Sequence, residues 1–262
     1  MNVSAIENSL SKKITKSVGR AIGDFDLINH GDRILVALSG GKDSWSLLYA
    51  LLMLQGRAPI QYEISAVTVD LGTPEFNHEV ISQRLAREGV THHVIGGSVK
   101  HLVDEKLTRG TNPCSLCSRF RRGFIYTFAR LHGCNKIALG HHRDDFVETL
   151  MLNLFFNGSI KGMSPKLLAD DMVNTVIRPL VYVSESLTTH LARKLEVPLI
   201  DCGCHHERMA RSRRQWVKGL LTAIEKDVPD VKSNILAGMQ RIHYRHLLGD
   251  KKRQAIDMTA SS

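Results

Sequence analysis

The chain has 262 residues, of which 43% are hydrophobic and 23% charged, and its formal net charge is +9. This length and composition are typical of a globular protein with a sizeable core. No apolar run approaches the roughly 20 residues that span a bilayer, and the N-terminus lacks the apolar segment of a secretory signal. We therefore expect a cytoplasmic protein without a membrane partner. The positive charge favours an acidic partner.

Strand and helix patterns alternate along most of the chain. An N-terminal helix is expected over residues 1–25. Apolar, β-branched runs predict strands at 33–38, 62–69, 91–95, 136–139 and 175–177, with a further short strand at 198–200. Helical spacing lies between them, as at Phe146, Val147, Leu150, Met151 and Leu154. This alternation predicts an α/β fold: a parallel sheet with helices on both faces and helical extensions at both ends. We expect the ligand-binding domain over 26–200 and a basic helical extension over 201–262.

The stretch Ser39-Gly40-Gly41-Lys42-Asp43-Ser44 stands between a predicted buried strand and a predicted buried helix. Glycines let backbone N–H groups approach an anion, and the helix N-terminus adds positive potential. Lys42 adds a full charge and the serines add hydroxyl donors. The glycines are adjacent, unlike those of the usual nucleoside-triphosphate loop, which places four residues between them. This stretch predicts a phosphate site.

Two more polar stretches follow predicted strands, namely Asp70-Leu71-Gly72 and Gly140-His141-His142-Arg143-Asp144-Asp145. The carboxyl ends of parallel strands gather ligands, so we expect both stretches near the loop at 39–44.

The C-terminal segment is rich in basic residues. No acidic residue lies between the first and the last of Arg208, Arg211, Arg213, Arg214 and Lys218. Helical spacing puts Arg211, Arg214 and Lys218 on one face and Val217, Leu220, Leu221 and Ile224 on the other. Such a helix is suited to a phosphate backbone, although an ordinary solvated face has the same pattern.

Cys114 and Cys117 are separated by two residues and precede a helical pattern, and Cys202 and Cys204 lie far downstream. An odd total of five cysteines in a cytoplasmic chain argues against a disulfide framework. Three interpretations remain open from spacing alone: an iron–sulfur cluster on Cys114, Cys117 and Cys202, a structural zinc, or a redox dithiol.

Five motifs occur in order: the loop at 39–44, Cys114-Ser115-Leu116-Cys117-Ser118-Arg119-Phe120-Arg121-Arg122-Gly123, Gly140–Asp145, Lys161-Gly162-Met163-Ser164-Pro165-Lys166 and Ile177-Arg178-Pro179-Leu180. Together they resemble the tRNA 2-thiocytidine synthetases of the PP-loop ATP pyrophosphatase superfamily, from about Asp32 to Cys202. The resemblance implies a sulfurtransferase that thiolates a tRNA cytidine through an adenylated base. It also implies ATP, Mg²⁺, a sulfur donor such as a cysteine desulfurase, and a [4Fe-4S] cluster; it is compatible with a homodimer.

The resemblance also implies roles for single residues. Lys42, Asp43, Asp144 and Asp145 would be catalytic, the lysine on the departing pyrophosphate and the carboxylates on Mg²⁺, although an acidic helix N-cap is the alternative for each carboxylate. ATP would be bound by Ser39, Gly40, Gly41, Lys42, Asp43, Ser44, Asp70, Gly140 and His141. Cys114, Cys117 and Cys202 would hold the cluster, with Cys204 as the alternative third ligand. Lys161, Arg178, Arg121 and Arg122 would contact RNA or phosphate.

Two other functions remain open. A sulfurtransferase acting on another RNA position or a small molecule would keep the loop and the cluster. A zinc-stabilised RNA-binding protein would need no ATP turnover and no Lys42.

Overall fold

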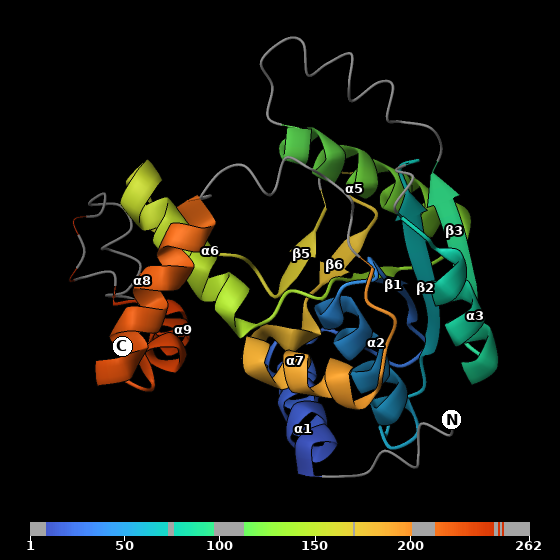
Figure 1. Ribbon diagram of the computed structural model, residues 1–262, viewed down its shortest axis with the longest axis horizontal. Coiled ribbons are helices and arrows are strands. Elements are labelled where there is room, and N and C mark those ends of the chain that lie inside the picture. The colour runs from blue at the N-terminus through green and yellow to red at the C-terminus, as the bar shows by residue number, and fades with distance from the viewer. Residues whose placement is uncertain are drawn as a thin grey trace, which may run out of the picture. The chain divides into compact units, whose positions relative to one another are not determined.

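The computed structural model describes residues 9–72, 76–96, 113–169, 171–200, 213–243, 246 and 248 (Figure 1); of residues 113–116 it describes the backbone alone. The chain divides into two compact units. The first comprises Met1–Phe146 and Met163–Ser212, and the second comprises Val147–Gly162 and Arg213–Ser262.

The first unit is built on a six-stranded sheet with the order β3-β2-β1-β4-β6-β5. The strands are β1 Arg33–Ala37, β2 Glu63–Asp70, β3 His92–Gly96, β4 Lys136–Ala138, β5 Lys166–Leu168 and β6 Thr175–Ile177. Strands β1, β2, β3, β4 and β6 pair in parallel. Strand β5 pairs antiparallel with β6. The predicted parallel sheet and its five main strands are confirmed.

The helices of the first unit are α1 Ser9–Asp24, α2 Lys42–Gln55, α3 Glu79–Glu88, α5 Pro113–Leu131 and α7 Glu185–Lys194, with a 3₁₀ turn at Pro179–Tyr182. α6 Arg143–Asn157 begins in this unit and continues into the second. Right-handed crossovers put α2 and α3 on one face of the sheet and α5 on the other, as Figure 1 shows. The predicted N-terminal helix and helices on both faces are confirmed.

The strand order reverses direction between β1 and β4, and this reversal determines where a ligand can bind. From β1 the chain steps outward through α2 to β2 and through α3 to β3, then returns beneath the sheet to β4, on the other side of β1. The loops that follow β1 and β4 therefore leave the same edge of the sheet in opposite directions and open a crevice between them. The loop at 39–44 and the stretch Gly140–Asp145 lie at this point.

Helix α2 is anchored in the core, as its apolar sequence predicts. Trp45, Leu48 and Tyr49 are fully buried, and the Trp45 indole Nε1–H donates to the carbonyl of Pro198 at 3.0 Å. This anchoring holds the N-terminus of α2, and with it the glycine loop, in a fixed place at the sheet edge.

Two details of the strands differ from the sequence-based expectation. Residues 198–200 do not form a strand, because Pro198 has no N–H to donate and only the Ile200 N–H pairs, with the carbonyl of Gly40 at 3.1 Å. The edge strand β5 was not predicted; it has three residues, and Leu167 and Leu168 are half exposed, so it carries no alternating apolar pattern.

The second unit contains the rest of α6 together with α8 Arg213–Asp227 and α9 Val231–Gln240. Val217 and Leu221 of α8 are buried, which confirms the apolar face expected there, whereas Ile224 is partly exposed. Arg208 and Arg211 lie outside the described residues. None of the described helices is long and apolar enough to cross a membrane.

Candidate functional site

The loop between β1 and α2 is held by its own serines. The Ser44 hydroxyl accepts from the Ser39 N–H at 3.2 Å and donates to the Gly41 carbonyl at 2.8 Å, and the Gly41 N–H donates to the Ser39 hydroxyl at 3.3 Å. These bonds close the turn without help from distant residues. The sequence therefore determines the shape of this loop locally, and its backbone stands at the N-terminus of α2, where an anion is favoured.

Gly40 meets two requirements at once. Its φ of +82° lies in the left-handed region, which side chains rarely adopt. A Cβ atom there would also lie 3.0 Å from the Cβ of Ile200. Any other residue would strain the turn and push the 198–200 segment away from the loop.

Gly140 brings the second loop of the crevice against the first. A Cβ atom on Gly140 would lie 2.9 Å from the carbonyl carbon of Asp43 and 2.9 Å from the backbone nitrogen of Ser44. The loop after β4 therefore touches the first turn of α2 backbone to backbone. The two stretches that the sequence assigns to one site do meet.

Lys42 lies between two carboxylates. Its ammonium nitrogen is 2.8 Å from Oδ2 of Asp43 and 3.3 Å from Oε1 of Glu185, the first residue of α7. Burial by itself would lower the pKa of Lys42, but hydrogen bonds and charge from Asp43 and Glu185 outweigh it and raise this pKa above its ordinary value. The lysine is thus a firmly charged, one-quarter exposed cation beside the loop.

Asp43 is fixed by residues far away in the chain. Its Oδ1 accepts a hydrogen bond from the Thr188 hydroxyl at 2.5 Å and lies 3.7 Å from Nε2 of His142. The Lys42 ammonium donates to both carboxylate oxygens, to Oδ1 at 2.9 Å and to Oδ2 at 2.8 Å, so Lys42 and α7 share Oδ1.

The two aspartates that begin α6 cap helices in this structure. Asp144 is buried, and its Oδ2 accepts from the Glu185 N–H at 2.7 Å, which caps α7. Asp145 accepts from the His142 N–H at 3.0 Å, while its own N–H faces Nδ1 of His142 at 3.4 Å, a reciprocal cap of α6. The capping alternative raised by the sequence thus describes what both carboxylates contact, and a direct role in catalysis stays a prediction.

Three more predicted residues lie at or just after the ends of strands β2, β4 and β6. Nδ1 of His141 lies 3.3 Å from Nε of Arg178, whose Nη1 donates to the Ser164 carbonyl at 2.6 Å. Burial lowers the pKa of Arg178 below its ordinary value, although it stays cationic. Asp70, at the end of β2, accepts from the Gly72 N–H at 2.7 Å and pairs with His78 at 3.2 Å.

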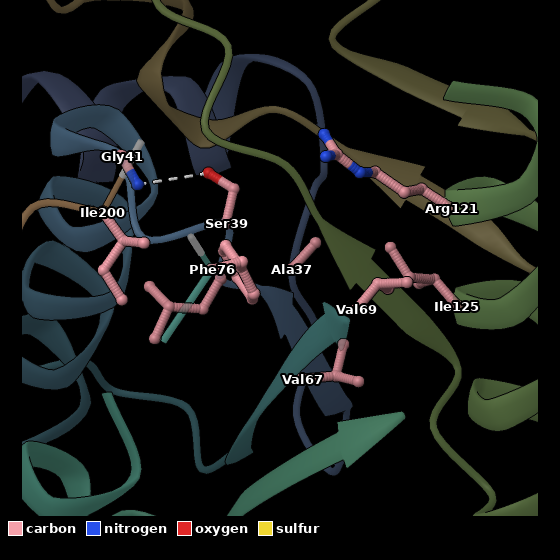
Figure 2. Close-up of a pocket in the computed structure, with 10 residues that line it drawn as sticks. Ala37, Ser39, Gly41, Val67, Val69, Phe76, Arg121, Ile125 and Ile200 are labelled. Atoms are coloured by element: carbon pink, nitrogen blue, oxygen red, sulfur yellow. Dashed lines mark hydrogen bonds between the residues drawn. The ribbon is translucent and has the colours of Figure 1, made fainter. Parts of the chain in front are cut away.

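A cavity of about 280 Å³ opens beside the loop. Its walls come from the ends of β1 and β2, from α5 and from the 198–200 segment, and its lining residues are Ala37, Leu38, Ser39, Gly41, Val67, Val69, Phe76, Arg121, Ile125 and Ile200. Most of these side chains are apolar, as a nucleobase pocket requires. Figure 2 shows Arg121 extending from α5 toward the side of the cavity that carries Ser39.

The cysteine pair lies at the start of α5, on the other face of the sheet. Cys114 lies in the first turn of this helix and Cys117 is its fifth residue, so both are near the N-terminus, where a thiolate is favoured. Cys117 is half buried and packs with Leu71, Phe120 and Phe124 at the end of β2. Cys202 and Cys204 lie outside the described residues, as does the side chain of Cys114. Among the described side chains, no three His, Cys, Asp or Glu gather closely enough to hold a metal.

Sequence reasoning missed three members of the site, namely Glu185, Thr188 and His142 as the partners of Lys42 and Asp43. The Ser184-Glu185 pair does read as a helix start. Nothing in the sequence connects that start with a loop more than 140 residues earlier.

The chain matches the PP-loop domain family over residues 7–213. It is 45% identical to the tRNA-cytidine(32) 2-sulfurtransferase of Geobacter metallireducens, over 96% of this chain and 97% of the relative. It is 46% identical to the protein of the same name from Geobacter sulfurreducens, over 97% and 98%.

A similar solved structure is the U34-tRNA thiolase NcsA of Methanococcus maripaludis with its [4Fe-4S] cluster. Its TM-score is 0.72 at 24% identity, and the match covers 93% of this chain and 81% of that one. This likeness shows a shared fold. From the matched domain and the near full-length identity, the chain belongs to the PP-loop family of the tRNA-cytidine(32) 2-sulfurtransferases.

Proposed function

We propose that the protein is an ATP-dependent sulfurtransferase that converts a cytidine of tRNA, position 32 as in the names of its relatives, into 2-thiocytidine. The observation that carries this proposal is the contact between the glycine loop with Lys42 and the backbone of Gly140, at the strand crossover and beside the 280 Å³ cavity. Action on tRNA agrees with the cytoplasmic location that the sequence predicts and with the net charge of +9.

The chemistry has two steps. The base oxygen O2 attacks the α-phosphorus of ATP, the bond to the β-phosphate oxygen breaks, and pyrophosphate leaves. A sulfur nucleophile then attacks C2, the C2–O bond breaks, and AMP departs with the former base oxygen. Adenylation is needed because an amide-like oxygen is a poor leaving group, whereas AMP is a good one.

The residues of the crevice supply the first step. The apolar cavity beside Val67 and Val69 would receive the adenine, and the amides of the loop would face the phosphates. Lys42 would leave its carboxylates for the departing pyrophosphate and neutralise the charge that develops there. Asp43, released from the lysine and still held by Thr188, would then be available to Mg²⁺.

The N-terminal end of α5 suits a [4Fe-4S] cluster. Cys117 is half buried among Leu71, Phe120 and Phe124, and thiols near a helix N-terminus become ligating thiolates. Cys114 and Cys117 would hold the cluster together with Cys202 or Cys204. When bound on three cysteines, the cluster supplies an iron site at which sulfur can be delivered to the base. We infer a separate sulfur donor, such as a cysteine desulfurase.

The test uses anaerobically purified protein with an unmodified tRNA transcript, ATP, Mg²⁺ and a sulfide source. We expect 2-thiocytidine in the nucleoside digest and one AMP per thiolated base. Lys42→Ala should lose the product, and Lys13→Ala, an exposed lysine of α1, should not. Full thiolation by Lys42→Ala would reject the role of the loop. Zinc in place of iron in the anaerobic protein would reject the cluster and favour a zinc-stabilised RNA-binding protein.

A further inference from the structure

The second unit carries a cluster of exposed aromatic side chains, which we call the aromatic patch: Phe155 and Phe156 of α6 and Trp216 of α8. The Trp216 ring meets Phe155 edge to face with centroids 6.0 Å apart, and it meets Phe156 in the same way at 5.8 Å. The exposed fractions are 53% for Trp216, 48% for Phe155 and 39% for Phe156. Single exposed apolar residues are ordinary, but a contiguous aromatic group marks an interaction site.

The aromatic patch has a basic border on the same helix. The Arg213 guanidinium carbon lies 4.8 Å above the centroid of the Phe156 ring. One residue on, Arg214 pairs with Glu148 at 3.3 Å and donates to the Thr149 hydroxyl at 3.3 Å, both on α6. Positive charge therefore adjoins the aromatic rings.

Buried residues of α8 and an ion pair to α6 hold the aromatic patch in place. Val217 and Leu221 are buried on a different face of α8 from Trp216, so the helix cannot rotate to hide Trp216 without exposing them. The ion pair of Arg214 with Glu148 holds α8 to α6. Trp216 is 53% exposed, so part of its indole remains open to a ligand.

We propose that the aromatic patch stacks on unpaired bases of the RNA substrate while Arg213 neutralises a neighbouring phosphate. Aromatic faces interleaved with arginine and lysine are how proteins hold single-stranded nucleic acid. This inference rests on the proposed function. It adds to that function a binding surface on the second unit, where aromatic rings stack on loop nucleotides.

Charge decides between RNA and a second copy of the chain as the occupant. A symmetric contact through this patch would place Arg213 and Arg214 close to the same residues of the partner copy. Like charges in such a contact are unfavourable, and the chain already carries a net charge of +9. RNA phosphates would neutralise the same charges.

The test compares two replacements of Trp216 in the full-length protein. Trp216→Tyr keeps an aromatic face, whereas Trp216→Leu keeps an apolar side chain and removes the face. Binding of an unmodified tRNA transcript is measured by fluorescence anisotropy at several salt concentrations. We expect Trp216→Leu to weaken binding by about ten-fold, within the range of one lost base–aromatic stack, and Trp216→Tyr to stay within about two-fold of the wild type.

Controls separate stacking from charge and from damage to the fold. Trp216→Leu should leave the salt dependence of binding unchanged, whereas Arg213→Gln should reduce its slope by about one phosphate. Leu131→Ala, at an exposed apolar residue of α5, should bind as the wild type does. In the wild type, saturation with RNA should protect Trp216 from acrylamide quenching, since the other tryptophan, Trp45, is fully buried.

Three results would overturn the inference. Equal binding by wild type and Trp216→Leu would show that the patch does not touch RNA. Equal weakening by Leu and Tyr, with a change of mass in sedimentation, would identify a second copy of the chain as the occupant. Unaltered quenching at saturation would show that the indole stays exposed in the complex. Failure of the wild type itself to bind the transcript would instead reject the proposed function.

Discussion

Gly140→Ala tests whether the contact between the two loops of the crevice is needed for activity. The added methyl would lie 2.9 Å from the carbonyl carbon of Asp43 and the backbone nitrogen of Ser44, and 3.0 Å from the Asp43 carbonyl oxygen. All three atoms are backbone, so no side chain can turn away. Ordinary van der Waals contact would require the loops to separate by about half an ångström, and such overpacking costs about 1–3 kcal/mol.

The functional effect should exceed the effect on stability. Displacing the start of α2 moves Lys42 and Asp43 together, and a misplacement of about 1 Å can cost about a hundred-fold in rate. We expect thiolation by Gly140→Ala to fall by at least about ten-fold, while urea denaturation shows the stability loss given above. Gly23→Ala in α1, where an added Cβ meets nothing within 4 Å, is the matched control and should lose neither. A Gly140→Ala protein with wild-type stability and rate would refute the reasoning.

Three further predictions concern single side chains. Glu185→Gln should lower the pKa of Lys42 toward its ordinary value, because one of the two carboxylates that raise it is gone; NMR titration of the ammonium group measures this, and an unchanged pKa would contradict the ion pair. The same pair stabilises the fold below the ordinary lysine pKa, and this contribution is lost as the pH rises through the raised value. Asp144→Ala should lower the free energy of unfolding by about 1–2 kcal/mol through loss of the α7 cap, and Asp144→Asn by less; equal stability of both variants in urea would rule out the cap. Burial lowers the pKa of His92 to about 4, so protonating it is harder in the folded than in the unfolded protein. His92 therefore does not reduce the free energy of unfolding above the unfolded pKa of 6.5, but reduces it by up to about 3 kcal/mol as the pH falls toward 4. His92→Gln should flatten the dependence of stability on pH in that window, and an unchanged curve would show that another group causes it.

The parts of the fold that local chemistry determines were predictable. The loop at 39–44 is closed by hydrogen bonds between Ser39, Gly41 and Ser44, all within six residues, and the buried strand and helix on either side are continuous apolar runs. Helical spacing likewise found the buried face of α8. The meeting of Gly140 with α2 followed from the rule that ligand loops gather at the carboxyl ends of strands.

The parts that depend on tertiary contacts were not predictable. The partners of Lys42 and Asp43 come from α7, and a single glutamate or threonine in an amphipathic helix carries no sign of a distant lysine. β5 is short and half exposed, so pairing with β6 alone makes it a strand. The run at 198–200 has the composition of a strand, but Pro198 lacks a donor and the segment serves instead to pack against Gly40.

The transfer of the base oxygen to AMP tests the central claim most directly. A transcript carrying ¹⁸O at O2 of the target cytidine is thiolated in the presence of ATP, and the nucleotide products are analysed by mass spectrometry. We predict one ¹⁸O in AMP for each 2-thiocytidine formed, because the oxygen leaves with the adenylate. Unlabelled AMP, or ADP with phosphate as the products, would contradict activation of the base through the loop at Ser39–Ser44.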